Sequence, residues 1–137
     1  MSKENVEIVR QIYDAVGRRD PEAVLALYHR DVELDFSHTE IAEFFEHSTF
    51  HGHEGLRSYD REWREAFENV ETDCEELIDA GDQVVSVARY RMRGRASGIE
   101  VPGNPHAGVW TIDEGKVTRV VWFNTRADAL EAAGFEG

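Results

Sequence analysis

The chain has 137 residues, of which 41% are hydrophobic and 31% charged, and its formal net charge is −13 at pH 7. This length fits one domain, because two domains sharing it would each be too small to bury a good core. The negative charge excludes nucleic acid and anionic membrane surfaces as expected partners, since their phosphate groups would be repelled. We therefore expect one acidic globular domain over residues 1–137.

The cysteine content and the N-terminal segment indicate the compartment. The chain has one cysteine, Cys74, which cannot form an intramolecular disulfide and is typical of a reducing environment. The first residues, MSKENVEIVRQIY, contain no unbroken apolar run, so we expect neither a signal peptide nor a membrane span. These features predict a cytoplasmic protein.

The N-terminal third is predicted to begin with two helices. Val6, Val9, Tyr13 and Val16 recur at helical spacing and form one apolar face of the first. Asp20-Pro21-Glu22 predicts the start of the second, because it places a capping acid before a proline in the first turn.

A strand and a third helix are expected next. Residues 32–36 alternate between apolar and polar side chains, which predicts a strand. Residues 37–50 are predicted to form a short helix or a lid-like excursion. After a glycine-containing turn at 51–55, a longer amphipathic helix is expected, whose apolar stripe comprises Leu56, Tyr59, Trp63 and Phe67.

The remainder of the chain is predicted to form an antiparallel meander. Turn signals at 79–82, 98–104 and 113–115 separate long apolar segments. The expected strands cover residues 72–78, 83–95, 105–112 and 116–124, and a short helix is expected at 127–133. Helices followed by a sheet define an α+β fold in which the helices pack on the sheet.

Several short strings carry a family resemblance over nearly the whole chain. They are Asp20-Pro21-Glu22-Ala23, Phe50-His51-Gly52-His53-Glu54-Gly55-Leu56, Asp79-Ala80-Gly81-Asp82-Gln83-Val84-Val85, Glu114-Gly115-Lys116-Val117 and Ala129-Leu130-Glu131-Ala132-Ala133-Gly134. With the element order, they resemble the nuclear-transport-factor-two-like superfamily and, within it, the SnoaL-like group related to ketosteroid isomerase. The resemblance implies a cystatin-like cone, in which a curved antiparallel sheet wraps the N-terminal helices around a cavity.

The resemblance also supplies a register for the strands. It points Ala88, Tyr90 and Met92 into the cavity and the arginines between them, from Arg89 to Arg95, to the outside. In the last strand it points Val120, Trp122 and Asn124 inward. The expected ligand-binding residues are Phe36, Tyr59, Trp63, Phe67, Ala88, Tyr90, Met92, Val120 and Trp122, an aromatic lining typical of small-molecule sites.

The catalytic groups of the isomerase are only partly matched. That chemistry uses a carboxylate base with a tyrosine and a neutral aspartic acid as hydrogen-bond donors. Tyr13 matches the tyrosine, whereas Phe36 stands at the position of the base and the second donor falls near Ala107. Steroid isomerisation is therefore not expected.

Two histidines and an asparagine are the remaining candidates for chemistry. His51 or His106 could act as the base, while Tyr13 polarises a substrate oxygen and Asn124 orients the substrate. Each histidine could instead be a turn or rim residue. For His106, the simplest register points Ala107 and Val109 inward, so a bulge would be needed to bring it inside.

The sequence predicts a protein that binds a small hydrophobic or polyketide-like molecule, with cofactor-free isomerase, cyclase or dehydratase activity. No metal or other cofactor is expected, because His51 and His53 in a glycine turn are poorly spaced for a zinc site. The alternative is a non-catalytic binding module or a dimeric interaction module. A homodimer through the sheet is expected in either case.

Overall fold

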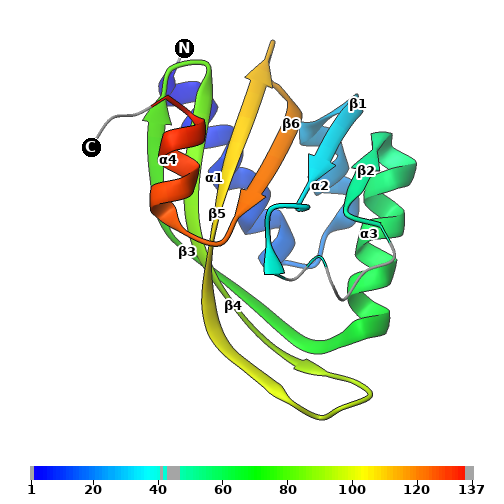
Figure 1. Cartoon of the computed structure of the whole chain (residues 1–137). Coiled ribbons are helices and arrows are strands. Elements are labelled where there is room, and N and C mark those ends of the chain that lie inside the picture. The colour runs from blue at the N-terminus through cyan, green and yellow to red at the C-terminus, as the bar shows by residue number, and fades with distance from the viewer. Residues whose placement is uncertain (1, 41, 43–46, 135–137) are drawn as a thin grey trace.

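The computed structural model describes residues 2–40, 42 and 47–134 (Figure 1). Its elements are, in chain order, α1 (Ser2–Gly17), α2 (Pro21–Leu27), β1 (Tyr28–Asp35), β2 (Thr49–His51), α3 (Gly52–Ala66), β3 (Phe67–Ala80), β4 (Gln83–Gly94), β5 (Glu100–Asp113), β6 (Lys116–Phe123) and α4 (Arg126–Ala132). This confirms the predicted α+β class. Part of the expected lid segment, residues 41 and 43–46, lies outside the described residues.

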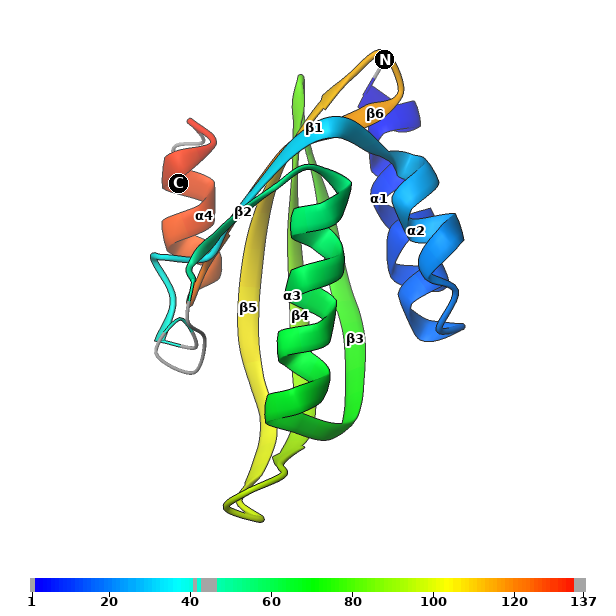
Figure 2. The ribbon, with the colours of Figure 1, turned by 90° about the vertical axis from the view of Figure 1, so that its right-hand side faces the viewer.

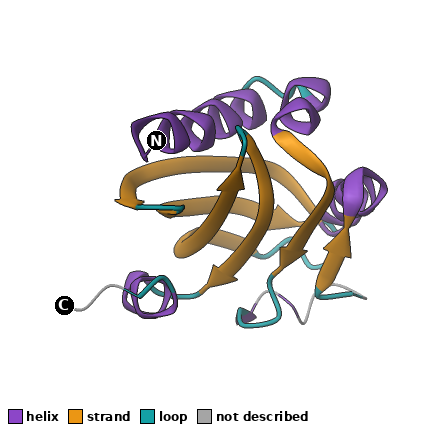
Figure 3. Cartoon of the chain, turned by 90° about the horizontal axis from the view of Figure 1, so that it is seen from above, coloured by secondary structure: helices purple, strands orange, loops and turns teal. Residues whose placement is uncertain are grey.

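The strands form one six-stranded sheet in the order β2-β1-β6-β5-β4-β3. The predicted meander is present from β3 to β6, and β1 joins it by pairing parallel to β6. The sheet is strongly curved: α1 and α2 lie on one side of it and α4 lies on the other (Figures 2 and 3). We call the side against α1 and α3 the inner face and the side against α4 the outer face.

Several strand limits differ from the sequence-based expectation. β1 begins at Tyr28, β3 begins at Phe67 directly after α3, and β5 begins at Glu100. The chain also forms β2, which the sequence analysis did not predict. These extensions depend on pairing with strands distant in the sequence, such as Glu68 opposite Arg93, and such tertiary contacts override local patterns.

The two faces of the sheet bury separate apolar clusters. On the inner face, α1 contributes Val9 and Ile12, which are 0% and 2% exposed, to the large cluster that also contains the side chains of β1, β4 and β6. On the outer face, Ala129 and Leu130 of α4 pack against Val85, Ala107 and Val109. The described helices include none that is long and apolar enough to cross a membrane.

The outer face of β3 and β4 carries a ladder of opposite charges. Arg89 Nε lies 2.9 Å from Glu75 Oε1, Arg91 lies 3.9 Å from Glu71, and Arg93 lies 3.9 Å from Glu68. The arginines therefore face outward, as the register predicted. Because these side chains remain substantially exposed, each pair contributes at most about 1 kcal/mol of stability.

Substitutions on α1 test whether its buried side chains stabilise the packing of this helix on the sheet. Ile12→Ala should lower the free energy of unfolding by about 2–5 kcal/mol, because it leaves a cavity under the helix. Val16→Ala, on the same helix but 44% exposed, should change it by less than about 0.5 kcal/mol. Urea unfolding of both variants measures this, and equal losses would show that α1 is not anchored through Ile12.

Candidate functional site

The pairing of β4 with β5 determines which side chains share the inner face. Ser86 lies opposite Gly108, and Ala88 lies opposite His106. Cross-strand partners project to the same face of a sheet, so His106 faces inward with Ser86 and Ala88. The expectation that Ala107 and Val109 point inward was wrong: both pack against α4 on the outer face.

The inward position of His106 results from an irregularity in the pairing of β5 with β4. Tyr90 lies opposite Asn104, but its neighbour Arg91 lies opposite Pro102, so the register shifts at this point. A shift of one residue exchanges the two faces of a strand. A register carried through β5 without this shift therefore assigns the wrong face to residues such as His106 and Ala107.

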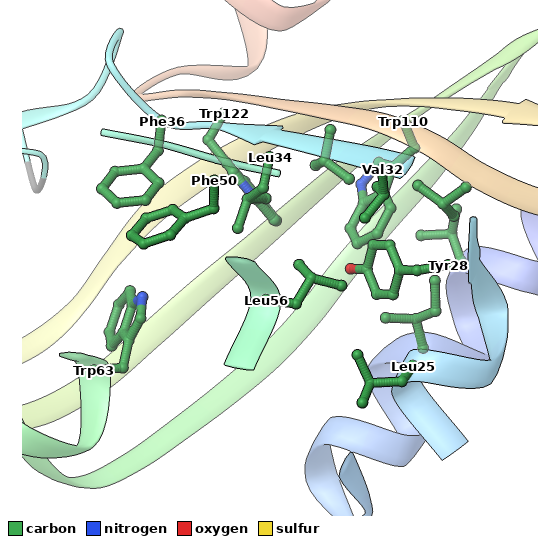
Figure 4. Close-up of a cluster of buried hydrophobic side chains, with 14 of the residues drawn as sticks. Leu25, Tyr28, Val32, Leu34, Phe36, Phe50, Leu56, Trp63, Trp110 and Trp122 are labelled. Carbon is green, nitrogen blue, oxygen red and sulfur yellow. The ribbon is translucent and has the colours of Figure 1, made fainter. Parts of the chain in front are cut away.

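A continuous series of ring contacts lines the inner face. Figure 4 shows Trp110 and Trp122 on the sheet, Phe36 and Phe50 at one end, and Trp63 facing them from α3. The contacting pairs, with ring-centroid separations, are Phe36–Tyr59 at 5.5 Å, Tyr59–Trp63 at 5.9 Å, Trp63–Tyr90 at 5.6 Å, Tyr90–Trp122 at 6.3 Å, Trp122–Trp110 at 5.6 Å and Trp110–Tyr13 at 5.8 Å. Aromatic rings thus make up much of the inner face.

All four tyrosines of the chain lie in this region and interact with one another. Burial raises the pKa of Tyr13, Tyr28 and Tyr59 well above the usual value of 10.0, and the proximity of Tyr90 raises each further. Burial likewise raises the pKa of Tyr90. At neutral pH these phenols are uncharged, so each can donate a hydrogen bond.

Three side chains form a buried hydrogen-bonded group, which we call the Ser86 triad. Trp110 Nε1 donates to Ser86 Oγ at 2.8 Å, and Tyr13 Oη donates to Ser86 Oγ at 2.9 Å. Ser86 is 0% exposed and Trp110 is 2% exposed. The triad joins α1 to β4 and β5, and it accounts for why Tyr13 is held against the sheet.

Gly108 makes room for the Ser86 triad. A Cβ atom at this position would lie 2.9 Å from Trp110 Nε1, 3.1 Å from Ser86 Oγ and 3.0 Å from Trp122 Cζ3. These separations are shorter than ordinary van der Waals contacts. Glycine in a strand interior often marks such a close approach.

Trp122 presents a buried donor without a partner. The residue is 7% exposed, and its Nε1 has no hydrogen-bond acceptor among the described residues. Leaving such a group unpaired costs about 1–3 kcal/mol. Trp122 differs in this respect from Trp110, whose N–H is paired with Ser86.

His106 is the titratable side chain that the β5 register brings inside. It is 8% exposed, and its ring meets that of Tyr90 edge-on, with centroids 4.5 Å apart and an interplanar angle of 72°. The predicted catalytic residues Tyr13, on α1, and His106, on β5, therefore both belong to the inner face.

The other two catalytic candidates lie elsewhere. The His51 side chain is 69% exposed and lies 4.0 Å from Glu33, on the outer side of β2. Asn124 Oδ1 accepts a hydrogen bond from the backbone N–H of Glu40 at 3.2 Å, which ties the end of β6 to the segment after β1. Both residues thus have structural contacts away from Tyr13.

Several predicted lining residues lie in the core of the inner face. Ala88 and Val120 are 0% exposed, and Phe36, Phe67 and Met92 are 2%, 4% and 5% exposed. The sequence analysis missed four residues of the site: Tyr28, Ser86, Gly108 and Trp110. Ser86 shares the strand parity of Ala88 and Tyr90, so its inward direction could have been read from the same alternation.

Within residues 2–40, 42 and 47–134, no group of three or more histidine, cysteine, aspartate or glutamate side chains is arranged to hold a metal ion. The chemistry of the inner face therefore rests on phenol, indole, hydroxyl and imidazole groups.

The raised pKa values give a test of tyrosine burial. Absorbance at 295 nm should show no tyrosinate in the folded protein at pH 10, whereas all four tyrosines should titrate near pH 10 in denaturant. Because the unfolded chain loses these protons first, the free energy of unfolding should fall as pH rises above 10. Tyrosinate formation near pH 10 without unfolding would contradict their burial.

Gly108→Ala tests the close approach at the Ser86 triad. The added methyl group should displace Trp110 or Trp122 and lower the free energy of unfolding by about 1–3 kcal/mol. Gly17→Ala is the matched control, since a Cβ there meets nothing within 4 Å. Denaturant titration compares them, and a neutral Gly108→Ala would show that the triad tolerates a side chain.

Comparison with known proteins agrees with this architecture. An NTF2-like protein from Burkholderia thailandensis is 27% identical with a TM-score of 0.78, over 96% of this chain and 98% of that chain. A protein described as a SnoaL-like polyketide cyclase, from Mesorhizobium loti, is 22% identical with a TM-score of 0.69, over 85% and 96%. A protein with a ketosteroid isomerase-like fold from Catenulispora acidiphila, in complex with trimethylamine, is 19% identical with a TM-score of 0.72, over 95% and 94%.

No curated protein matches the sequence. The sequence profile of the SnoaL-like domain matches residues 9–120, which is most of the chain and includes β1 to β5 with the Ser86 triad. The chain therefore belongs to the SnoaL-like domain family.

Proposed function

We propose that the protein binds a small, flat and mostly apolar organic molecule that carries a hydrogen-bond acceptor, on the inner face of the sheet. The observation that carries this proposal is the Trp122 N–H, which is buried without an acceptor among the described residues. A phenylalanine would fill the same core position without this unpaired donor. The cost of the donor is offset if a ligand supplies the acceptor.

The surroundings of Trp122 suit such a ligand. The Tyr90 and Trp110 rings flank it at centroid distances of 6.3 and 5.6 Å and offer apolar surface for a ring system. The inner face also presents phenol and indole groups, which can stabilise a carbonyl or similar oxygen without a charged partner. The related protein in complex with trimethylamine and the relative described as a polyketide cyclase support a small organic molecule as ligand.

We further propose that binding leads to cofactor-free proton transfer, as in an isomerisation, cyclisation or dehydration. Tyr13 would polarise the ligand oxygen, and His106 would accept and return a proton, because imidazole can do both near neutral pH. His51 and Asn124 are assigned no role in this scheme, since their contacts lie elsewhere.

The second candidate is a binding protein without catalysis. It is favoured by the outward position of the strand carboxylates: Glu33 pairs with Arg119 at 2.9 Å, and Asp35 lies 4.0 Å from His38. His106→Gln separates the two functions, because it should leave binding nearly intact and abolish turnover. Cytoplasmic location and a homodimer through the sheet remain predictions, and sedimentation measures the oligomeric state directly.

Trp122→Phe tests the proposal, with Trp110→Phe as its matched control. Both variants remove one indole N–H and a similar volume. The difference between their free energies of unfolding therefore reports whether the lost N–H was hydrogen-bonded. Trp110→Phe removes a paired donor and leaves Ser86 Oγ without the hydrogen bond from Trp110. It should therefore be the less stable variant by about 1–3 kcal/mol. Urea unfolding measures both free energies.

The two substitutions should also differ in their effect on ligand binding. Native mass spectrometry of the wild-type protein should detect a bound small molecule, and Trp122→Phe should lose it. Equal destabilisation by the two substitutions, together with an adduct that persists in Trp122→Phe, would contradict the role of this donor.

A further inference from the structure

Tyr28 carries a buried hydroxyl that has no partner in the described part of the chain. The residue is 8% exposed, and its Oη makes no hydrogen bond within residues 2–40, 42 and 47–134. Its main chain is held differently, because its carbonyl oxygen lies 3.0 Å from His53 Nε2. A hydroxyl that leaves water without gaining a partner is destabilising, and buried polar groups in folded proteins are rarely left in this state. The fold thus accounts for the ring of Tyr28 but not for its hydroxyl.

Tyr13 shows the contrasting case of a structural hydroxyl on the same face. Its Oη donates to Ser86 Oγ at 2.9 Å, which joins α1 to β4. Phenylalanine in place of Tyr13 would break this hydrogen bond. Phenylalanine in place of Tyr28 would fill the same core position and break none among the described residues. The hydroxyl of Tyr28 therefore has a role outside the packing of the chain.

The hydroxyl of Tyr28 is directed into the cluster of side chains on the inner face. In Figure 4 its oxygen points toward Leu56 of α3. The Tyr28 ring lies 6.3 Å from that of Trp110, and Trp110 in turn lies 5.6 Å from Trp122. Trp110 therefore separates two buried donors that lack an acceptor among the described residues, the phenol of Tyr28 and the indole N–H of Trp122.

We propose that Tyr28 is a specificity-determining residue that hydrogen-bonds a second polar group of the ligand, so that the site selects flat apolar molecules with an oxygen substituent at each end. This inference rests on the proposed function, which supplies the contact at Trp122. An indole N–H can only donate, so the ligand group at Trp122 must be an acceptor such as a ketone. A phenol both donates and accepts, so the ligand group at Tyr28 is a hydroxyl or a second carbonyl.

The separation of the two donors indicates the size of the ligand. The Trp110 ring lies between them, with centroid distances of 6.3 Å to Tyr28 and 5.6 Å to Trp122. This arrangement favours two fused rings with substituents at their far ends over a single ring, because polar atoms must reach both sides of Trp110. Leu56, which Figure 4 shows beside the Tyr28 oxygen, supplies apolar surface for the body of such a molecule.

Tyr28→Phe tests whether the hydroxyl has a structural role. Because this substitution removes a buried group without a partner, it should leave the midpoint of urea unfolding unchanged or raise it slightly. Tyr13→Phe is the matched control, since it removes the hydroxyl that donates to Ser86, and it should lower the midpoint. Equal losses in the two variants would show that the Tyr28 hydroxyl has a partner in the folded chain, and would overturn the inference.

Two probes that differ in one substituent test the role of the hydroxyl in binding. 5-Hydroxy-1-indanone carries its ketone and its hydroxyl at opposite ends of two fused rings, and 5-methyl-1-indanone has a methyl group of similar size in place of the hydroxyl. Calorimetry or ligand-observed NMR gives both dissociation constants, and their ratio in the wild-type protein is compared with the ratio in Tyr28→Phe. The preference for the hydroxyl probe should fall by about 5- to 10-fold in the variant, which corresponds to one hydrogen bond.

A second variant and the possible outcomes separate the inference from the proposed function. Trp122→Phe should weaken the binding of both probes equally, because both carry the ketone, and it should leave their ratio unchanged. A ratio that Tyr28→Phe does not alter would contradict the inference alone. If neither probe binds to the wild-type protein, the proposed function is wrong, and the inference fails with it.

Discussion

The register of β4 against β5 is the constraint on which the rest of the site depends. Ser86 opposite Gly108, and Ala88 opposite His106, place hydroxyl, imidazole and indole groups on one face of the sheet. One residue of slip would send all of them to the outer face and bring Ala107 and Val109 inside. The outer face also needs this register, because Ala107 and Val109 form the surface on which α4 packs.

From this register follows an interior with an unusual polar character. The phenols of Tyr13, Tyr28, Tyr59 and Tyr90 are kept protonated by burial, and the strand carboxylates Glu33 and Asp35 are directed to the outer side. The described inner face therefore offers hydrogen-bond donors and aromatic surface to the ligand that we propose. This differs from the carboxylate chemistry of ketosteroid isomerase, although Tyr13 stands where the resemblance places the tyrosine of that enzyme.

The helices could be predicted from the sequence, because each depends on a local period of apolar residues, and the faces of β4 and β6 with the outward arginine ladder followed from the register that the resemblance implied. The face of β5 could not, because it depends on the shift between Tyr90 and Arg91 in the pairing with β4. β2 was missed because three residues, Thr49–His51, carry too short a pattern and form a strand by pairing with Leu34 and its neighbours. Ser86 and Gly108 are ordinary residues in sequence, and their importance depends on two tryptophans that reach them from β5 and β6.

The most direct test of this account follows the indole N–H signals of the three tryptophans by ¹H–¹⁵N NMR, assigned with the Trp→Phe variants. On addition of 1-indanone, the Trp122 indole proton should shift downfield as it gains an acceptor, while the Trp110 signal, already paired with Ser86, should move little. A Trp122 signal that does not move while 1-indanone binds would contradict the central claim that this buried donor is kept for a ligand.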